Sequence, residues 1–110
     1  MLNKPLQLPE DIQRILLRVR DEIVRLDWVD KIILFGSYAK GCYDQNSDLD
    51  IAVFVKKGYC CHLEEYRQLA RICRTAQLDI QVQAFSSSEL EEPCGIVDEI
   101  VEFGIDITQS

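Results

Sequence analysis

The stretch from Ile32 to Phe54, IILFGSYAKGCYDQNSDLDIAVF, decides the fold of this 110-residue chain. It begins with an apolar run that ends at a Gly-Ser pair, and a polar connection then leads to an Asp-Leu-Asp triplet that opens a second apolar run. Short apolar runs bounded by turn-forming residues are typical of buried strands. The stretch therefore predicts one strand over residues 29–35 and another over residues 49–55, joined by a loop too polar to be buried.

The two aspartates of the triplet, Asp48 and Asp50, share one face of the second strand because side chains along a strand alternate. Two carboxylates at the start of a buried strand lose hydration and repel each other unless a cation lies between them. Mg²⁺ takes oxygen ligands, retains several waters and is usually completed by substrate phosphates. The pair therefore predicts a divalent metal site, although an Asp-x-Asp triplet by itself also occurs in solvated loops.

The residues that follow the first strand suit the phosphates of such a substrate. Gly36 permits a sharp turn and a close approach of backbone N–H groups to a phosphate. Ser37 adds a hydroxyl group and is expected to cap a short helical turn over residues 38–40, while Lys40 supplies a flexible positive charge. A Gly-Ser pair after a strand, taken alone, is also ordinary turn chemistry.

Gly-Ser, ten intervening residues and Asp-x-Asp, with each half attached to an apolar strand, together resemble the nucleotidyltransferase signature of the DNA polymerase β superfamily. Within that superfamily the chain looks most similar to the minimal nucleotidyltransferases, small stand-alone domains often paired as antitoxins with HEPN-domain toxins. It departs from many of them at Lys40, where they carry arginine, because lysine lacks the bidentate grip of a guanidinium group on phosphate.

Periodicity predicts the remaining elements. We expect helices over about 9–27, 62–76 and 96–103, a short helical piece through Leu90 capped by Ser88, a strand over 78–85, and a short edge strand over 105–107. Gly104 is expected to end the last helix as its C-cap. This order predicts an α/β fold with a small mixed sheet flanked by helices, in a single domain over residues 1–110 with its core at about 10–107. The resemblance implies the same fold, that of the polymerase β palm.

Asp79, at the start of the third predicted strand, resembles the family's third metal carboxylate; an ordinary turn aspartate is the alternative. The resemblance implies that two Mg²⁺ ions, for which Mn²⁺ can substitute, are held by Asp48, Asp50 and Asp79. It also implies that the phosphates of an NTP, with ATP expected, are bound by Gly36, Ser37 and Lys40. One ion would lower the pKa of the attacking hydroxyl while the other neutralises the triphosphate. Asp79 would then help to deprotonate the acceptor.

The charge of the chain limits its partners. A net charge of −7 and a pI near 4.6 disfavour capture of DNA or RNA, which depends on Lys and Arg displacing counterions. An acidic chain suits a basic protein partner, and the resemblance implies a helical, HEPN-like toxin, in a homo- or hetero-oligomer. Arg67, Arg71 and Arg74 recur at helical spacing and are read as a solvated helix face.

Five cysteines show no disulfide framework spacing, and the chain has neither a signal segment nor an apolar run long enough to cross a membrane. These features predict free thiols in a cytoplasmic protein. The adjacent Cys60, Cys61 and His62 lack the two-residue spacer of structural zinc motifs, so we read them as residues at the entry of a helix.

Three functions are compatible with these features. The first is a nucleotidyltransferase that modifies a hydroxyl group of a partner protein, as minimal nucleotidyltransferase antitoxins do to their toxins. The second is the same chemistry on a small molecule or an RNA end, although the relatives with that activity usually carry a further helical domain. The third is an antitoxin that acts by binding alone, against which the intact set of acids argues.

Overall fold

The computed structural model describes residues 8–44, 46–60, 62–76 and 78–108 and contains one mixed sheet. Its strands are β1 (Val29–Phe35), β2 (Leu49–Val55), β3 (Ile80–Ser86) and β4 (Ile105–Asp106), in the spatial order β3-β2-β1-β4. β1 pairs antiparallel with both β2 and β4, whereas β2 and β3 are parallel. The predicted α/β fold with a small mixed sheet is therefore confirmed.

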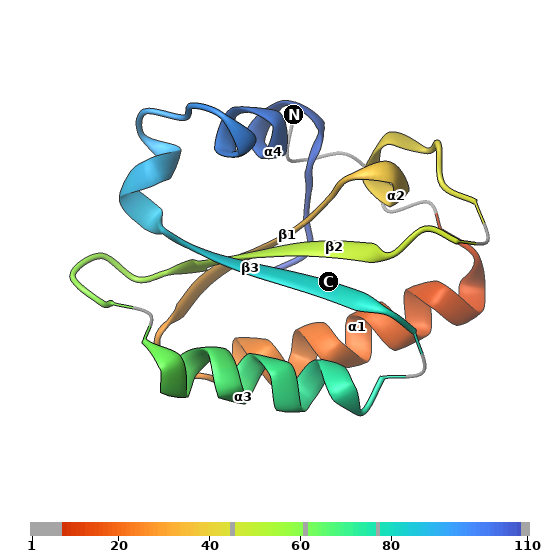
Figure 1. Ribbon diagram of the computed structural model, residues 1–110, viewed down its shortest axis with the longest axis horizontal. Helices are drawn as coiled ribbons and strands as arrows, with labels where there is room; N and C mark the ends of the chain where they lie inside the picture. The colour runs from red at the N-terminus through yellow and green to blue at the C-terminus, as the bar shows by residue number, and fades with distance from the viewer. Residues whose placement is uncertain (1–7, 45, 61, 77, 109–110) are drawn as a thin grey trace.

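Helices cover the sheet on both sides (Figure 1). On one side lie α1 (Glu10–Val24) and α3 (Leu63–Arg74), the second of which is the crossover between the parallel strands β2 and β3. On the other side lie the short 3₁₀ helix η1 (Ser87–Leu90) and α4 (Ile96–Phe103). The four-residue α2 (Ser37–Lys40) follows β1 directly at one end of the sheet. None of the described helices is both long enough and apolar enough to span a bilayer.

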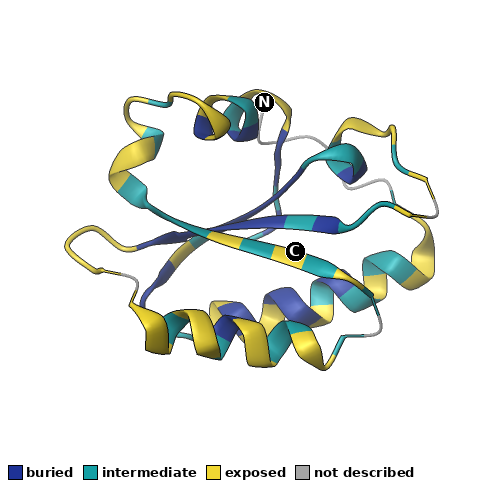
Figure 2. Ribbon diagram, in the orientation of Figure 1, coloured by how far each residue is buried: buried dark blue, intermediate teal, exposed yellow. Residues whose placement is uncertain are grey.

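Both faces of β1 and β2 are buried, as Figure 2 shows. Ile32 and Leu34 belong to the core formed with α1 and α3, while Ile33 and Phe35 belong to a second cluster that includes residues of α4. A strand covered on both faces needs apolar residues at successive positions rather than at alternate ones. This explains why the central parts of the two strands, Ile32–Phe35 and Ile51–Val55, are uninterrupted apolar runs; both strands have the bounds expected.

The helix expected over about 9–27 ends at Val24, because the chain turns tightly to enter β1. The N–H of Leu26 donates to the carbonyl of Ile23 at 3.0 Å, and the N–H of Val29 donates to that of Leu26 at 3.2 Å. These turns bring Trp28 into the core, where its Nε1 donates to Oε1 of Gln68 at 3.3 Å. The indole therefore closes the junction between α1, β1 and α3.

The predictions of two helix caps were wrong. Ser37 is the first residue of α2, and Gly36 occupies the N-cap position. η1 is capped by Ser86 rather than by Ser88: the Oγ of Ser86 accepts from the N–H of Ser88 at 3.4 Å, and Glu89 accepts from the N–H of Ser86 at 2.8 Å. Glu89, three residues after Ser86, completes a capping box with it.

The other boundaries differ by one or two residues. The helix expected over 62–76 is α3, which His62 caps with help from Glu65, and the strand expected over 78–85 is β3. The edge strand expected over 105–107 is limited to Ile105 and Asp106. Four thiols, those of Cys42, Cys60, Cys73 and Cys94, are free, and Cys61 lies outside the described residues.

Gly104 ends α4 as predicted, with its N–H donating to the carbonyl of Ile100 at 2.8 Å. Its backbone is extended, with φ of −72°, so the left-handed conformation of a usual glycine cap is not the reason for glycine. A Cβ at this position would lie 2.2 Å from the carbonyl oxygen of Ile100 and 2.6 Å from Cγ2 of Ile33. Glycine is therefore required by the close approach of α4 to β1.

We expect Gly104→Ala to lower the free energy of unfolding by about 2 kcal/mol or more, because backbone and a core side chain must both shift. Gly58→Ala is the control, since Gly58 has φ of +80° and open space around it. It should cost only the left-handed backbone penalty of about 1 kcal/mol. Urea unfolding of both variants checks this, and a Gly104→Ala protein as stable as the Gly58→Ala protein contradicts the packing argument.

Candidate active site at the end of the sheet

The register of the sheet brings the predicted site residues to one end of it. Because β1 and β2 are antiparallel, Phe35 at the end of β1 pairs with Asp50 near the start of β2. Because β2 and β3 are parallel, Leu49 pairs with Ile80, and the starts of these two strands lie side by side. The turn after β1, the Asp-Leu-Asp triplet and Asp79 therefore come from segments far apart in the sequence and lie close together.

Gly36 adopts φ of +78° and ψ of −156°, which L-residues with a side chain rarely adopt. The lack of room for a side chain is a second reason for glycine at this position. A Cβ added to Gly36 would lie 2.3 Å from Oδ2 and 3.0 Å from Cγ of Asp50. The Asp50 carboxylate therefore packs directly on the backbone of the turn, and any side chain at position 36 would displace it.

Asp50 is partly buried in an unfavourable environment for a negative charge. It lies on the face of β2 that also carries Ala52 and Phe54. Burial, and secondly the negative charge of Asp48, raise the pKa of Asp50 above its ordinary value. A divalent cation between the two carboxylates would remove both costs, since it replaces lost hydration and offsets the repulsion.

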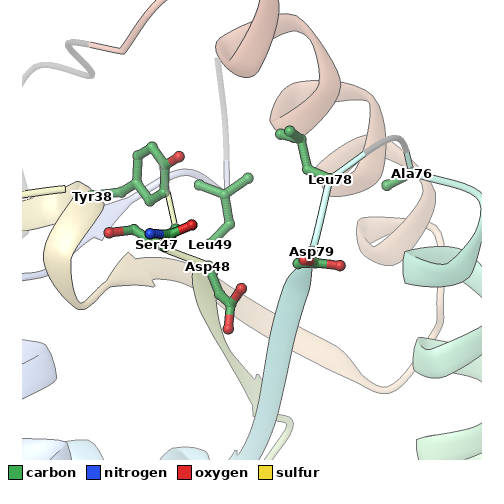
Figure 3. Close-up of a pocket in the computed structure, with 8 residues that line it drawn as sticks. Tyr38, Ser47, Asp48, Leu49, Ala76, Leu78 and Asp79 are labelled. Atoms are coloured by element: carbon green, nitrogen blue, oxygen red, sulfur yellow. The ribbon is translucent and has the colours of Figure 1, made fainter. Parts of the chain in front are cut away.

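Asp48 and Asp79 stand just before the starts of β2 and β3 (Figure 3). The N–H of Leu49 donates to the carbonyl oxygen of Asp79 at 3.0 Å, which ties the two strand starts together. Gln81, next along the same face of β3, donates from Nε2 to Oδ2 of Asp48 over a long 3.5 Å. Among the described residues no three His, Cys, Asp or Glu side chains converge closely enough to hold a metal ion. The arrangement is thus a close acidic pair with a third, exposed acid on the neighbouring strand.

A cavity of about 560 Å³ opens beside these acids (Figure 3). Its polar side includes the carboxylates of Asp48 and Asp79, and its apolar side is made by the strand starts and by α2. The lining residues are Tyr38, Asn46, Ser47, Asp48, Leu49, Ala76, Leu78 and Asp79. The acids therefore border a space large enough for part of a substrate.

Sequence reasoning missed Tyr38 as a residue of this cavity. Its ring is buried and stacks on Tyr43, with the ring centroids 4.3 Å apart and the planes at 12°. Burial raises the pKa of the Tyr38 phenol, so the hydroxyl stays protonated and able to donate. Tyr43, in the loop after α2, therefore holds the Tyr38 ring from one side. No local pattern distinguishes the two tyrosines, because the loop that brings them together is irregular.

Lys40 lies near the Gly36 turn, but its side chain extends to α4. Its Nζ forms an ion pair with Oε1 of Glu99 and lies 5.0 Å from the centroid of the Phe103 ring. The hydrogen bond to Glu99 raises the pKa of Lys40. Lys40 is therefore a bridge between α2 and α4 in this structure, and its predicted contact with phosphate stays a prediction.

Residues 18–110 match the model of the family described as polymerase beta, nucleotidyltransferase. A Methanocaldococcus jannaschii protein, whose name provisionally assigns it protein adenylyltransferase activity, is 31% identical over 83 residues, which cover 74% of this chain and 81% of the relative.

Solved structures show the same fold. A crystal structure of a Sulfolobus solfataricus protein, provisionally classed as a nucleotidyltransferase, matches with a TM-score of 0.58 at 18% identity, covering 91% of this chain and 87% of the other. A crystal structure of a toxin–antitoxin with AMP-PNP matches with a TM-score of 0.59 at 21% identity, covering 93% of this chain and 75% of the other. A crystal structure of a point mutant of the MntA-HpeT toxin–antitoxin matches with a TM-score of 0.54 at 25% identity, covering 91% of this chain and 72% of the other.

The contact between Gly36 and Asp50 can be tested by substituting Gly36 with and without the Asp50 carboxylate, with Gly41 as the control. Gly41 has φ of +79° and nothing within 4 Å of an added Cβ. Gly41→Ala should cost only the left-handed penalty of about 1 kcal/mol, whereas Gly36→Ala should cost more, because φ of +78° with ψ of −156° is a region essentially limited to glycine. Gly36→Ala should carry roughly 1 kcal/mol on top of this backbone cost, because it forces Asp50 aside.

A double-mutant cycle measured by urea unfolding isolates that extra term. Gly36→Ala should cost roughly 1 kcal/mol less in an Asp50→Ala background than in the wild-type chain, whereas the cost of Gly41→Ala should be the same in both. A cost of Gly36→Ala that Asp50→Ala leaves unchanged would show that Asp50 does not rest on this turn.

Proposed function

Because the chain belongs to the polymerase beta nucleotidyltransferase family, we propose that it transfers AMP from ATP to a hydroxyl group of a partner protein. The observation that carries this proposal is the packing of the Asp50 carboxylate on the Gly36 turn, beside Asp48. A phosphate-binding turn and an acidic pair in direct contact suit a triphosphate that arrives with a divalent metal. The name of the Methanocaldococcus jannaschii relative supports transfer of an adenylyl group to protein.

The donor set at the site fits magnesium. Asp48 and Asp50 offer only oxygen ligands, and the raised pKa of Asp50 indicates a charge that the protein alone does not compensate. Two Mg²⁺ ions, held by this pair and by Asp79, would neutralise the triphosphate and lower the pKa of the acceptor hydroxyl. Mn²⁺, which accepts the same ligands, would substitute.

The residues of the chain then have separate tasks. The backbone N–H groups after Gly36 and the hydroxyl of Ser37 bind the outer phosphates and hold the α-phosphate in line with the acceptor. The acceptor oxygen bonds to the α-phosphorus as the bond to the β-phosphate oxygen breaks, and pyrophosphate leaves. Asp79, exposed at the start of β3, accepts the proton that the hydroxyl loses. Lys40 would contact phosphate by exchanging its bond to Glu99 for one to the substrate.

We infer further that the acceptor belongs to a helical, basic, HEPN-like toxin that this chain neutralises as a cytoplasmic antitoxin. Two structural neighbours are toxin–antitoxin complexes, one of them with AMP-PNP. The net charge of −7 favours rapid encounter with a basic protein. The cavity beside Asp48 and Asp79 offers space for a side chain that carries the acceptor hydroxyl.

A second candidate function is neutralisation by binding alone. One observation favours it: among the described residues the three acids do not converge into a metal-binding group. Catalysis and binding alone differ in one measurable respect, because only the first changes the mass of the partner.

We expect Asp48→Asn and Asp50→Asn to lower AMP transfer by about two orders of magnitude or more, since each removes a charge that the metal and the triphosphate require. Asp50→Asn should leave the protein as stable or more stable, because the raised pKa shows that the ionised carboxylate disfavours the folded state. Asp79→Asn should reduce turnover far more than it weakens ATP binding.

Labelled-ATP transfer assays, calorimetric titration with Mg²⁺-ATP and thermal unfolding check these expectations. Asp98→Asn, an exposed acid of α4, is the control for the loss of one negative charge. Unchanged ATP affinity and turnover in both Asp48→Asn and Asp50→Asn would mean that the site is elsewhere.

The partner can be sought by purifying the chain from its native lysate. We expect one small basic protein to co-purify, to dissociate as salt is raised, and to gain one or more AMP masses after incubation with ATP and Mg²⁺. A partner that binds but never changes mass would support neutralisation by binding. If the chain elutes alone and modifies an RNA end or a small molecule efficiently, the protein acceptor is excluded.

A further inference from the structure

β3 forms an open edge of the sheet. The spatial order β3-β2-β1-β4 places β3 at one end, and no other described strand lies beyond it. In Figure 1 it is the strand nearest the viewer, crossing in front of β2 and β1. An open edge presents a row of unpaired backbone donors and acceptors that another strand can join.

The register identifies which backbone groups of β3 face outward. The N–H of Leu49 donates to the carbonyl of Asp79, so residues 79, 81, 83 and 85 direct their N–H and C=O groups toward β2. The groups of Ile80, Val82 and Ala84 therefore point away from the sheet. The next outward N–H, that of Ser86, donates to Glu89 within the chain. The unpaired outward groups therefore end at Ala84.

This edge lacks the features that usually keep edge strands apart. The sequence of β3, IQVQAFS, contains no charged residue and no proline, and its pairing with β2 runs in continuous register without a bulge. Natural edge strands are commonly protected by lysine, proline, bulges or short length. The opposite edge follows that rule, since β4 has only two residues.

We propose that β3 pairs antiparallel with β3 of a second copy of this chain, about a two-fold axis at Val82. In this register Val82 pairs with Val82 of the second copy, and Ile80 pairs with Ala84, so all the outward backbone groups are used. Apolar side chains then meet on the face of α3, and Gln81 meets Gln83 on the face of the acids. Within Ile80–Ala84 each cross-strand pair joins side chains of the same kind, which is the complementarity that a symmetric interface requires.

The adjacent helix offers a matching surface. Leu63 and Tyr66 are 66% and 43% exposed, and together with the exposed Ala70 they form a stripe on one side of α3. Ala70 also borders a hollow of about 400 Å³ with Ile80, so this side of α3 faces β3. A two-fold axis perpendicular to the sheet brings α3 of both copies together, so the two stripes meet, with the exposed Arg67 and Arg74 of each copy beside them.

The charge of this edge does not oppose a second copy. Two chains of net charge −7 repel each other, but Ile80–Ser86 is neutral, and antiparallel pairing keeps Asp79 away from Asp79 of the other copy. Asp79 instead lies across from Phe85 of the second copy, whose ring is stacked on Phe54 of its own chain. Both acidic sites then lie on the same face of one continuous sheet.

The test compares Val82→Pro with Val82→Ala in the full chain. Both variants lose the valine side chain, but only proline removes the outward N–H, and it leaves the pairing with β2 intact. Because the dimer is symmetric, the proline removes one intermolecular hydrogen bond donated by each copy. Val82→Pro should therefore raise the dimer dissociation constant by about thirtyfold relative to Val82→Ala. Sedimentation equilibrium of the 12.7 kDa chain measures it.

Salt dependence and hydrogen exchange supply independent readouts that need no catalytic activity. Dimerisation should strengthen as NaCl is raised, because salt screens the repulsion between two acidic chains. The amides of Ile80, Val82 and Ala84 in the wild-type chain should become protected as protein concentration rises. A wild-type chain that stays monomeric at about 0.5 M NaCl, or a dimer that Val82→Pro and Val82→Ala weaken equally, overturns the proposal. Absence of concentration-dependent protection at the three amides overturns it even if the proline variant fails to fold.

Discussion

The antiparallel pairing of β1 with β2 is the constraint on which the rest of the structure depends. It sets Phe35 opposite Asp50, and the next residue, Gly36, then turns directly over the Asp50 carboxylate. A one-residue slip would send Asp50 to the opposite face, into the core formed with α1 and α3, and would exchange the side chains that fill the two clusters. The register that buries the core is therefore the same register that assembles the candidate active site.

The acidic pair of Asp48 and Asp50 lowers the stability of the fold, and burial of the apolar core offsets this loss. Burial and the charge of Asp48 raise the pKa of Asp50, so the ionised pair disfavours folding in the absence of a cation. Residues directly after Asp50 along β2 are fully buried, and burial of apolar side chains contributes about 1.5–3 kcal/mol each. Functional sites commonly retain such unfavourable groups because binding of the ligand compensates them.

The end of the sheet is further held by contacts between elements distant in the sequence. Lys40 of α2 is paired with Glu99 of α4, and Gly104 allows α4 to approach β1 closely enough for β4 to add to the sheet. The turn that would bind phosphate is thus connected to the C-terminal helix. Movement of Lys40 toward a substrate would require Glu99 of α4 to give up this ion pair.

The sequence by itself determined the central strands, with their bounds, and indicated the contiguous pieces of the candidate site, Gly36, Ser37, Asp48 and Asp50. These are local features, because each depends on the alternation of one strand or on the chemistry of one turn. Only the tertiary structure decided that β3 lies parallel to β2 with Asp79 beside Asp48, that Tyr38 and Tyr43 stack at the cavity, and that Lys40 reaches Glu99. Lys40 and Glu99 are 59 residues apart, and periodicity carries no information about pairing over such a distance. The register of the sheet and the path of its connections supply that information, because they alone bring distant segments into contact.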